Sequence, residues 1–588
     1  MRNRAPSPEA LRLRRLMAFI VVLAVVFALR LVQFQIIQAP QINAESFSRR
    51  SITTTVPAMR GDIVDTNGKI LATTVMAYDI NVDPTLVTPF ETKINNVPTT
   101  ISVEQAANEM AAILKMDPAD VMKKLQGKSR YSQVAKQVDG ATYVKIKNLN
   151  IPWVYPQAVP HRIYPNGALA GNLLGFIGTE GNPLEGLEVS QNKCLAGVDG
   201  NETYQRGVDG IKIPGSAEVK VEPKNGGTLK LTIDSDLQFY AQQVMAKYVR
   251  NERADWGSAI VVEAKTGKIL AAAEAPSVDP NNYTAVNAEN RSSRIFRATF
   301  EPGSTVKMVT AATAIDQGVA TPLTRVLAPQ TTFVLNHFRI SDSHAHPTEK
   351  LTLQGILIES SNTGIIQIGE KVPYETRYKY WTKFGLGSRT SVNYPGEASG
   401  IVHATAPDGV SVYTTMFGQA MTVTPIQSAF VYQTFANLGV RLAPQLLETC
   451  TAADGTVTPA QTVGKPVRVL KQSTARQVIS MLEGDVAQKG GVGSTAAVPG
   501  YRIGGKSGTA QIANPNGVGY GSLHAISFIG MAPAEDPQYV LAVTIYKPRT
   551  VSNSIGATPP FKAIMEQILR TYRVPPSTTK SPIIPAKW

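Results

Sequence analysis

The stretch "EPGSTVKMVTAATAID" (residues 301–316) places a serine and a lysine three positions apart in otherwise apolar surroundings. Its Pro-Gly pair predicts the end of a loop, and the apolar run 306–315 predicts a helix that is buried on most of its circumference. Positions i and i+3 share one face of a helix, so Ser304 and Lys307 can touch. A buried ammonium group is costly unless it is paired or has a task, so this stretch predicts a reaction centre.

A serine hydroxyl attacks a carbonyl carbon only when a base removes its proton. Burial and a nearby cation lower the pKa of a lysine, which makes Lys307 a candidate base at neutral pH. The backbone N–H of Ser304, in the first turn, is free to bind an oxyanion. The spacing alone is weak evidence, because the pairs Ser190–Lys193 and Ser577–Lys580 share it, and a capping serine with a solvated lysine explains most such pairs.

Two further motifs strengthen the signal. The first, "ESSNTG" (359–364), supplies a hydroxyl at Ser360 and an amide at Asn362, at a predicted helix end. The second, "GGKSGTAQIA" (504–513), opens a predicted strand. Its candidate site residues are Lys506, Ser507, Gly508 and Thr509. Three motifs of these types in this order are typical of penicillin-binding proteins and class A β-lactamases.

A second Lys-Thr-Gly, at Lys265–Gly267, competes with the last motif. It lies between two predicted strands of alternating pattern, so its glycine is explained as a hairpin turn residue and its lysine as a solvated tip. It also precedes Ser304, whereas the third motif of this set follows the serine. The sequence therefore favours Lys506 over Lys265.

Composition predicts a folded chain of two or three domains, with 588 residues of which 43% are hydrophobic and 17% charged. The net charge is +14, yet no arginine-rich helix or zinc-finger spacing is present, so we expect an anionic wall polymer or lipid surface nearby rather than nucleic acid. The two cysteines, Cys194 and Cys450, fall in different predicted domains and are expected to be unpaired.

The N-terminus predicts a membrane anchor. Arginines at positions 2, 4, 12, 14 and 15 precede an apolar run, and residues 16–37 are long enough to cross the hydrocarbon layer as a helix. Clustered arginine before the run predicts a cytoplasmic N-terminus with the rest of the chain outside. A cleaved signal peptide is the alternative, but no small-x-small cleavage site follows closely.

The chain as a whole predicts an α+β fold. Strands come first, helices in the middle and strands last, which favours a largely antiparallel sheet with helices packed on it. The expected parts are a cytoplasmic basic tail (1–15), a single transmembrane helix (16–37), a mixed pedestal domain (38–225), a catalytic domain (226–574) and a disordered Pro-rich tail (575–588).

The sequence resembles the class B, monofunctional penicillin-binding proteins, and among them the FtsI type of septal peptidoglycan D,D-transpeptidase. The similarity covers nearly the whole chain. Besides the three motifs it rests on "RGDIVDTNG" (60–68), "RIYPNGALAGNLLGFIG" (162–178), "GLEVSQNKCLAG" (186–197), "IDSDLQ" (233–238) and "FGQAMTVTPIQ" (417–427). It implies an elongated, dimerisation-like pedestal and a serine β-lactamase-like transpeptidase domain. It also implies that the charged residues Arg60, Asp62 and Asp65 form pairs that tie the pedestal to the catalytic domain; a solvated surface is the alternative.

The resemblance implies a role for each site residue. Ser304 attacks the penultimate D-Ala carbonyl of a stem peptide that ends in D-Ala-D-Ala, and Lys307 takes its proton. Ser360 and Lys506 relay a proton to the leaving D-Ala. The substrate is held by Asn362, Ser507, Gly508 and Thr509. Ser507 replaces the commoner threonine, one hydroxyl for another.

The same resemblance implies the partners. Stem peptides serve as donor and amine acceptor, and β-lactams as covalent inhibitors. A polytopic, FtsW-like glycan polymerase and divisome membrane proteins are expected at the plasma membrane. No cofactor and no metal are expected.

Alternatives remain open. The chain could serve side-wall elongation, or act as a β-lactam-binding divisome scaffold with an inert site. A D,D-carboxypeptidase or membrane-bound β-lactamase would need a Glu-x-x-x-Asn element to position water, which is missing between the first and third motifs. Asp342, His344 and His346 could bind a metal, but no fourth ligand has suitable spacing.

Overall fold

The computed structural model describes residues 8–94, 97–205, 207, 213–335, 337–459, 464–488, 490–514 and 519–588. The chain forms two compact units, residues 1–58 with 197–225 and residues 59–196 with 226–588. The expected pedestal of residues 38–225 thus contributes to both units. The first part of the basic tail, with Arg2 and Arg4, lies outside the described residues.

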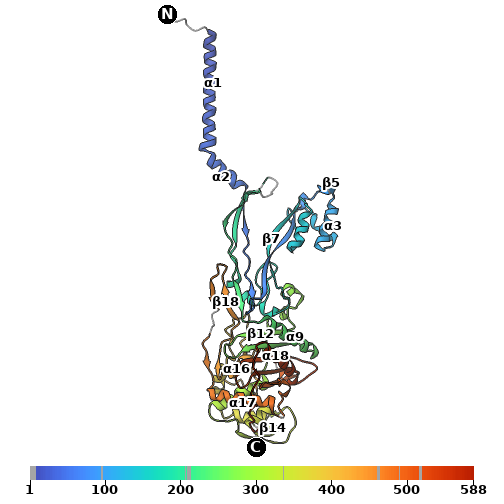
Figure 1. Ribbon diagram of the computed structural model, residues 1–588, viewed down its shortest axis with the longest axis vertical. Helices are drawn as coiled ribbons and strands as arrows, with labels where there is room; N and C mark the ends of the chain where they lie inside the picture. Colours follow the sequence, from blue (N-terminus) through green and yellow to red (C-terminus); the bar gives the residue numbers. More distant parts are fainter. Residues whose placement is uncertain are drawn as a thin grey trace. The chain divides into compact units, whose positions relative to one another are not determined.

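The first unit contains the expected apolar helix. Helix α1 (Pro8–Val32) continues through the π-helical turn η1 (Gln33–Ile37) to α2 (Ala39–Arg50) (Figure 1). The candidate span Pro8–Ile37 has a mean hydropathy of 2.5 and none of it is buried, as suits a helix whose surroundings are lipid. The helix begins before residue 16 because arginine and leucine are good helix formers. An antiparallel sheet completes the unit, in the order β1 (Ser51–Val56), β8 (Gly200–Gln205), β9 (Glu218–Val221).

The second unit begins with a seven-stranded sheet that joins distant parts of the chain. The predicted hairpin around Asn67 and Gly68 is confirmed, with Gly68 at φ +83°, in the left-handed region that favours glycine. The strands are β2 (Ile63–Val64), β3 (Ile70–Val82), β6 (Ser132–Val138), β7 (Val154–Ile163), β10 (Thr228–Leu231), β18 (Leu447–Thr451) and β19 (Val457–Pro459). A separate core around Trp153 packs on this sheet. Its other elements are α3 (Val103–Leu114), α4 (Pro118–Leu125), α5 (Gly140–Asn148) and the hairpin of β4 (Phe90–Ile94) and β5 (Val97–Ile101).

Buried charged side chains make polar contacts beside this sheet. Glu188 is fully buried and receives hydrogen bonds from Arg60 (2.6 Å) and Arg162 (2.8 Å), so its charge is paired on both oxygens. Asp65 is also buried and accepts a 2.6 Å hydrogen bond from the hydroxyl of Ser235, the first residue of α9 (Ser235–Asn251). The contact that the resemblance implied between residues 60–65 and the catalytic domain is therefore present at Asp65, and the solvated alternative is wrong there.

The catalytic part is built on a five-stranded antiparallel sheet. Its order is β12 (Ile269–Ala275), β11 (Trp256–Glu263), β23 (Tyr539–Tyr546), β22 (Tyr520–Ala532), β21 (Gly504–Ala513). The first two strands end at Ala275, whereas the last three begin only at Gly504. The α+β prediction is confirmed, and β21 lies at an edge of this sheet.

Helices cover both faces of the sheet. Ala259 and Val261 of β11 pack in one core with α9 and α18 (Thr558–Thr571), while Ile260 and Val262 point to the other face. That second core contains α11 (Lys307–Asp316), α13 (Asn362–Gly369), α16 (Pro425–Ala436) and α17 (Gln472–Ala487). Because both faces are buried, β11 is apolar almost throughout, rather than alternating as the sequence suggested.

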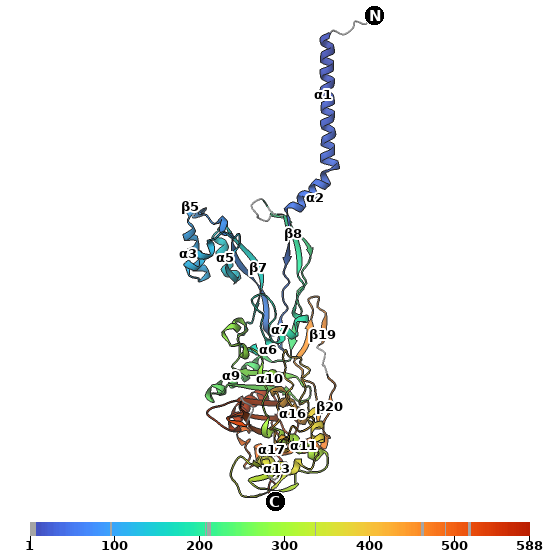
Figure 2. The same cartoon turned by 180° about the vertical axis from the view of Figure 1, so that it is seen from behind.

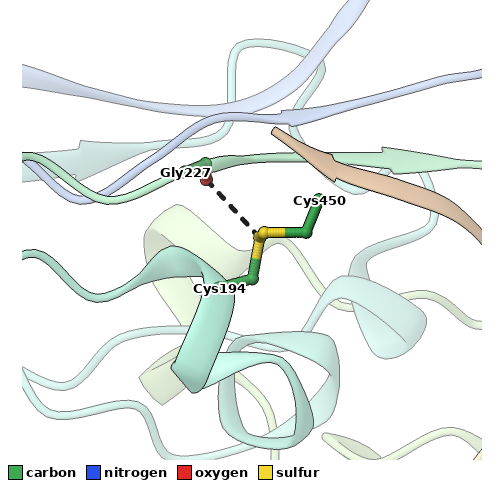
Figure 3. Close-up of a disulfide and its surroundings, with 3 residues drawn as sticks. All are labelled: Cys194, Gly227 and Cys450. Atoms are coloured by element: carbon green, nitrogen blue, oxygen red, sulfur yellow. Dashed lines mark hydrogen bonds between the residues drawn. A yellow bond between two sulfur atoms is a disulfide. The ribbon is translucent and has the colours of Figure 1, made fainter. Parts of the chain in front are cut away.

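The expectation of two unpaired cysteines is wrong. Cys194, in the short helix α8 (Asn192–Leu195), forms a disulfide with Cys450 of β18 across 256 residues of sequence (Figure 3). The bond is possible because β18 pairs with β10 and so reaches the sheet that the N-terminal strands form. It joins two segments that the sequence assigned to different domains.

The expectation of a disordered C-terminal tail is also wrong. The carbonyl of Ala586 accepts the Thr352 N–H (2.9 Å), and the indole of Trp588 donates to the carbonyl of Leu351 (3.1 Å). Both partners belong to β16 (Glu349–Thr352), and the C-terminus lies at the lower end of the catalytic part in Figures 1 and 2. Proline-rich sequence is compatible with this extended edge contact, since the tail uses its carbonyl groups as acceptors.

Reduction of the Cys194–Cys450 bond is expected to destabilise the protein by about 2–4 kcal/mol, because the unfolded chain regains the freedom that the cross-link removes. Thermal unfolding followed with and without dithiothreitol measures this loss. A Cys450→Ser variant should unfold at the temperature of the reduced protein and show no response to the reductant. Identical unfolding of fully oxidised and fully reduced protein would contradict a stabilising cross-link.

Candidate active site

Ser304 lies where a loop enters the central helix of the catalytic part. It is half-buried in the 3-10 turn η5 (Gly303–Val306), directly before α11. Gly303 has φ +56°, and a Cβ atom there would lie 2.8 Å from the carbonyl oxygen of Thr509 in β21. Only glycine lets the turn approach the strand this closely, so the serine is held next to the edge of the sheet.

Lys307 is fully buried one turn after the serine. Burial, and then the charge of Lys506, lower its pKa to about 7, against the opposing charges of Asp342 and Asp485. Its Nζ donates hydrogen bonds to the carbonyl and, at 3.3 Å, to the hydroxyl of Ser360. A large share of the Lys307 amine is therefore neutral at pH 7, as a general base requires.

Ser360 and Asn362 lie at the junction of α12 (Leu353–Ile358) and α13, as the sequence predicted. Ser360 has φ +56°, which is unusual for a residue with a side chain and typical of positions that their surroundings hold in place. Ser361 caps α13 by accepting the N–H of Gly364 (2.9 Å). The amide of Asn362 donates to the carbonyl of Ser341 (2.9 Å).

The third motif lies on β21. Lys506 is fully buried, donates to the hydroxyl of Ser507 (3.0 Å) and lies 3.5 Å from a carboxylate oxygen of Asp485. A Cβ atom on Gly508 would lie 2.5 Å from the hydroxyl of Ser527 and 2.8 Å from the methyl of Thr305. Gly508 therefore lets β21 pack tightly on η5.

These contacts bring the predicted residues together. The backbone of Gly303 lies against that of Thr509, and Lys307 donates a hydrogen bond to Ser360. The charge of Lys506 lowers the pKa of Lys307. Within the described residues, the hydrogen bonds of Lys307 go to Ser360 and not to Ser304; such contacts are often long before a substrate is bound.

The competing motifs lie elsewhere. Lys265 occupies a turn between β11 and β12, is largely exposed, and pairs with Asp536 (2.8 Å). Ser577 accepts the N–H of Arg502 in the C-terminal tail. The prediction that Lys265–Gly267 forms a hairpin turn is confirmed.

The metal alternative is not supported. In the part of the chain that the structure describes, no group of three or more His, Cys, Asp or Glu residues is arranged to hold a metal ion. Asp342 instead accepts the N–H groups of Asn362 (2.5 Å) and Thr363 (3.0 Å), and His344 is exposed.

Sequence reasoning missed two residues that support the third motif. Asp485 of α17 is buried beside Lys506; burial raises its pKa, which the charge of Lys506 opposes. The N–H of Ser554, in the turn η8 (Ser554–Ala557), donates to the hydroxyl of Thr509 (3.1 Å). Neither residue has a fixed spacing from a motif, so only folding reveals them.

The fold and the site together define an acyl-transferring enzyme of the serine–lysine type. Two family models match the chain: the penicillin-binding protein transpeptidase domain over residues 257–566 and the penicillin-binding protein dimerisation domain over residues 55–231. The chain belongs to the class B penicillin-binding proteins, as the resemblance in sequence indicated.

Individual relatives support this membership. The chain is 35% identical to the penicillin-binding protein PbpB of Mycolicibacterium smegmatis, over 96% of this chain and 90% of the relative. It is 31% identical to the peptidoglycan D,D-transpeptidase FtsI of Escherichia coli, over 95% and 91%. A crystal structure of penicillin-binding protein 3 of Mycobacterium tuberculosis with aztreonam superposes with a TM-score of 0.68 at 28% identity, covering 89% of this chain and 98% of that one.

Replacement of Lys506 tests which third motif is used. Lys506→Ala is expected to slow acylation by a penicillin at least about a hundredfold, because it removes a charge partner for the ligand carboxylate and the cation beside Lys307. The matched control Lys265→Ala should stay within about twofold and change stability by at most about half a kcal/mol. Stopped-flow acylation kinetics measure both variants, and the reverse ranking would show that β21 does not bind the ligand.

Proposed function

We propose that this protein is a peptidoglycan D,D-transpeptidase that cross-links stem peptides during cell division, with Ser304 as its nucleophile. The observation that carries the proposal is the buried amine of Lys307, one turn after Ser304 in the chain. Its pKa is about 7, and it donates a hydrogen bond to the hydroxyl of Ser360. The relatives named as D,D-transpeptidase and penicillin-binding proteins support the substrate class.

In the acylation step, the hydroxyl oxygen of Ser304 attacks the carbonyl carbon of the penultimate D-Ala while neutral Lys307 takes the hydroxyl proton. The N–H groups of Ser304 and Thr509 bind the oxyanion of the tetrahedral intermediate. The C–N bond to the terminal D-Ala then breaks, and Ser360 and Lys506 relay the proton that Lys307 took to the leaving amine. An ester between Ser304 and the donor peptide remains.

In the second step, the amine of a neighbouring stem peptide attacks this ester and gives its proton to Lys307. The bond to Ser304 breaks, the serine regains a proton, and an amide cross-link remains. Water in place of the amine would give a carboxypeptidase, the alternative within the same chemistry.

The donor peptide binds along β21. This strand lies at an edge of the sheet, where an added strand can pair with its outer backbone groups; the N–H of Ser507 donates to the carboxylate of Asp485 (3.3 Å). Asn362 holds a donor amide, the hydroxyls of Ser507 and Thr509 bind the terminal carboxylate, and Lys506 supplies positive charge. Gly508 keeps the strand close to Ser304.

The N-terminal sequence supports a location of this chemistry outside the cytoplasm. Arginines at positions 2, 4, 12, 14 and 15 precede the apolar run 16–37, which supports an N-terminus in the cytoplasm and a catalytic part that faces the wall. An FtsW-like glycan polymerase and divisome membrane proteins are the expected partners. Side-wall elongation and a scaffold with an inert site are the competing functions; a buried low-pKa amine argues against inertness.

A penicillin is expected to acylate Ser304 alone. Ser304→Ala should abolish covalent labelling while near-UV circular dichroism stays unchanged, and Lys307→Ala should slow acylation by about two to four orders of magnitude. In the unaltered protein the rate should rise with pH around pH 7, since Lys307 acts when it has lost its proton. Mass spectrometry that locates the adduct on Ser190, Ser360 or Ser577 would contradict the assignment.

A reporter enzyme that is active only after export is expected to be active when fused after Trp588. The expectation follows from one span with basic residues on its N-terminal side. A matched fusion before residue 8 should be inactive. Activity in the cytoplasm from the C-terminal fusion would overturn the topology and the substrate, because the wall lies outside.

A further inference from the structure

The carboxylate of Asp342 anchors the second motif without belonging to it. Asp342 lies between β15 (Phe338–Ser341) and β16, and its side chain is only 3% exposed. It accepts hydrogen bonds from the hydroxyl of Ser361 (2.6 Å) and from the N–H groups of Asn362 (2.5 Å) and Thr363 (3.0 Å). These contacts fix the first turn of α13, and with it the residues on either side of Ser361.

His346 completes an ion pair with this carboxylate. Its Nε2 lies 3.1 Å from a carboxylate oxygen of Asp342, and its Nδ1 lies 2.7 Å from the carbonyl oxygen of Pro347. Both partners only accept hydrogen bonds, so both ring nitrogens must carry a proton for both bonds to form. The geometry therefore requires a positively charged imidazolium. Burial opposes the charge, but these two hydrogen bonds outweigh burial and raise the pKa of His346 above its usual value.

A second carboxylate also acts on His346. Glu349 of β16 adds negative charge that favours the imidazolium, and Glu349 is itself paired with Lys587 of the tail (2.8 Å). His344 lies with its ring centre 5.2 Å from that of His346, but is exposed.

The pair also acts on the base. The negative charge of Asp342 favours the protonated form of Lys307, in opposition to burial and Lys506. A positive charge on His346, in contact with the same carboxylate, offsets this effect. The charge state of the pair therefore affects the pKa of Lys307, whose amine donates a hydrogen bond to Ser360.

We propose that Asp342 and His346 form a positioning ion pair that holds Ser360 and Asn362 in place and keeps Lys307 available as the base for acyl transfer. The proposal rests on the roles proposed above for these three residues. Asp342 and His346 act through other side chains and are not themselves catalytic.

The test is the pH dependence of acylation by a penicillin, measured as a second-order rate between pH 5.5 and 9. His346→Gln keeps a donor for Asp342 but removes the positive charge, so the midpoint of the profile should move to higher pH by about half a unit or more. Asp342→Asn removes the negative charge, so the midpoint should move to lower pH, together with a lower maximal rate. The matched control His344→Gln should retain the original midpoint.

Opposite shifts distinguish this proposal from a purely structural role, which would lower the rate without moving the midpoint. An unchanged midpoint in His346→Gln, or shifts of both variants in one direction, would overturn it. If Asp342→Asn fails to fold, as thermal unfolding would reveal, the His346→Gln profile alone decides. Failure of the unaltered protein to become acylated would instead contradict the proposed function.

Discussion

Two lysine amines buried in one site are the constraint on which the rest of the catalytic part depends. Removing an ammonium ion from water costs several kcal/mol, and two such ions within electrostatic reach disfavour each other. Lys506 meets this cost with Asp485 at 3.5 Å, and Lys307 meets it by giving up its proton more readily. A surface lysine such as Lys265 does not meet this cost, because its ion pair with Asp536 lies in contact with solvent. The free-energy cost of burying an ammonium ion is therefore what lowers the pKa of Lys307 and makes it a base at neutral pH.

Close backbone contacts keep those charges in register. A Cβ atom at Gly303 would press on Thr509, and one at Gly418 would lie 2.2 Å from the carbonyl oxygen of Gly303. Gly508 of β21 allows the same close contact from the strand, since a Cβ atom there would lie 2.8 Å from the methyl of Thr305. Side chains at these positions would move Ser304 away from β21, and misplacement by about 1 Å is enough to cost an enzyme much of its rate. These glycines therefore set the short distance between the turn that carries Ser304 and strand β21.

The sequence predicted what depends on neighbours in the chain. The three motifs, the hairpin at Lys265–Gly267 and the apolar helix at the N-terminus all follow from local spacing and pattern. The sequence failed where distant segments meet. The pairing of Cys194 with Cys450 depends on β18 joining the N-terminal sheet, and the order of the tail depends on the free edge of β16.

The same reason explains the gaps in the predicted site. Asp485 comes from a helix that also buries Thr474 and Glu483, so a carboxylate there does not by itself mark a site, and Asp342 comes from a loop in which it could equally be solvated or bind a metal. The role of Asp485 depends on its contact with Lys506, and the role of Asp342 depends on its contact with the first turn of α13; both contacts form only in the folded chain.

The two sides of the site are held by different forces. Lys307 lies on α11, whose side chains belong to a buried apolar core, and Ser304 lies in the turn η5 directly before it. Lys506 lies on β21, which is held by its pairing with β22. The positions of these three residues therefore follow from packing and from the sheet. Ser360 and Asn362 lie between two short helices, on a residue with positive φ, and depend on polar contacts with Ser341 and Asp342. Polar contacts respond to pH and to ligand, whereas packed apolar cores change little. Because α12 and α13 are themselves buried in the apolar core, any adjustment during acyl transfer is expected in the turn between them, which carries Ser360.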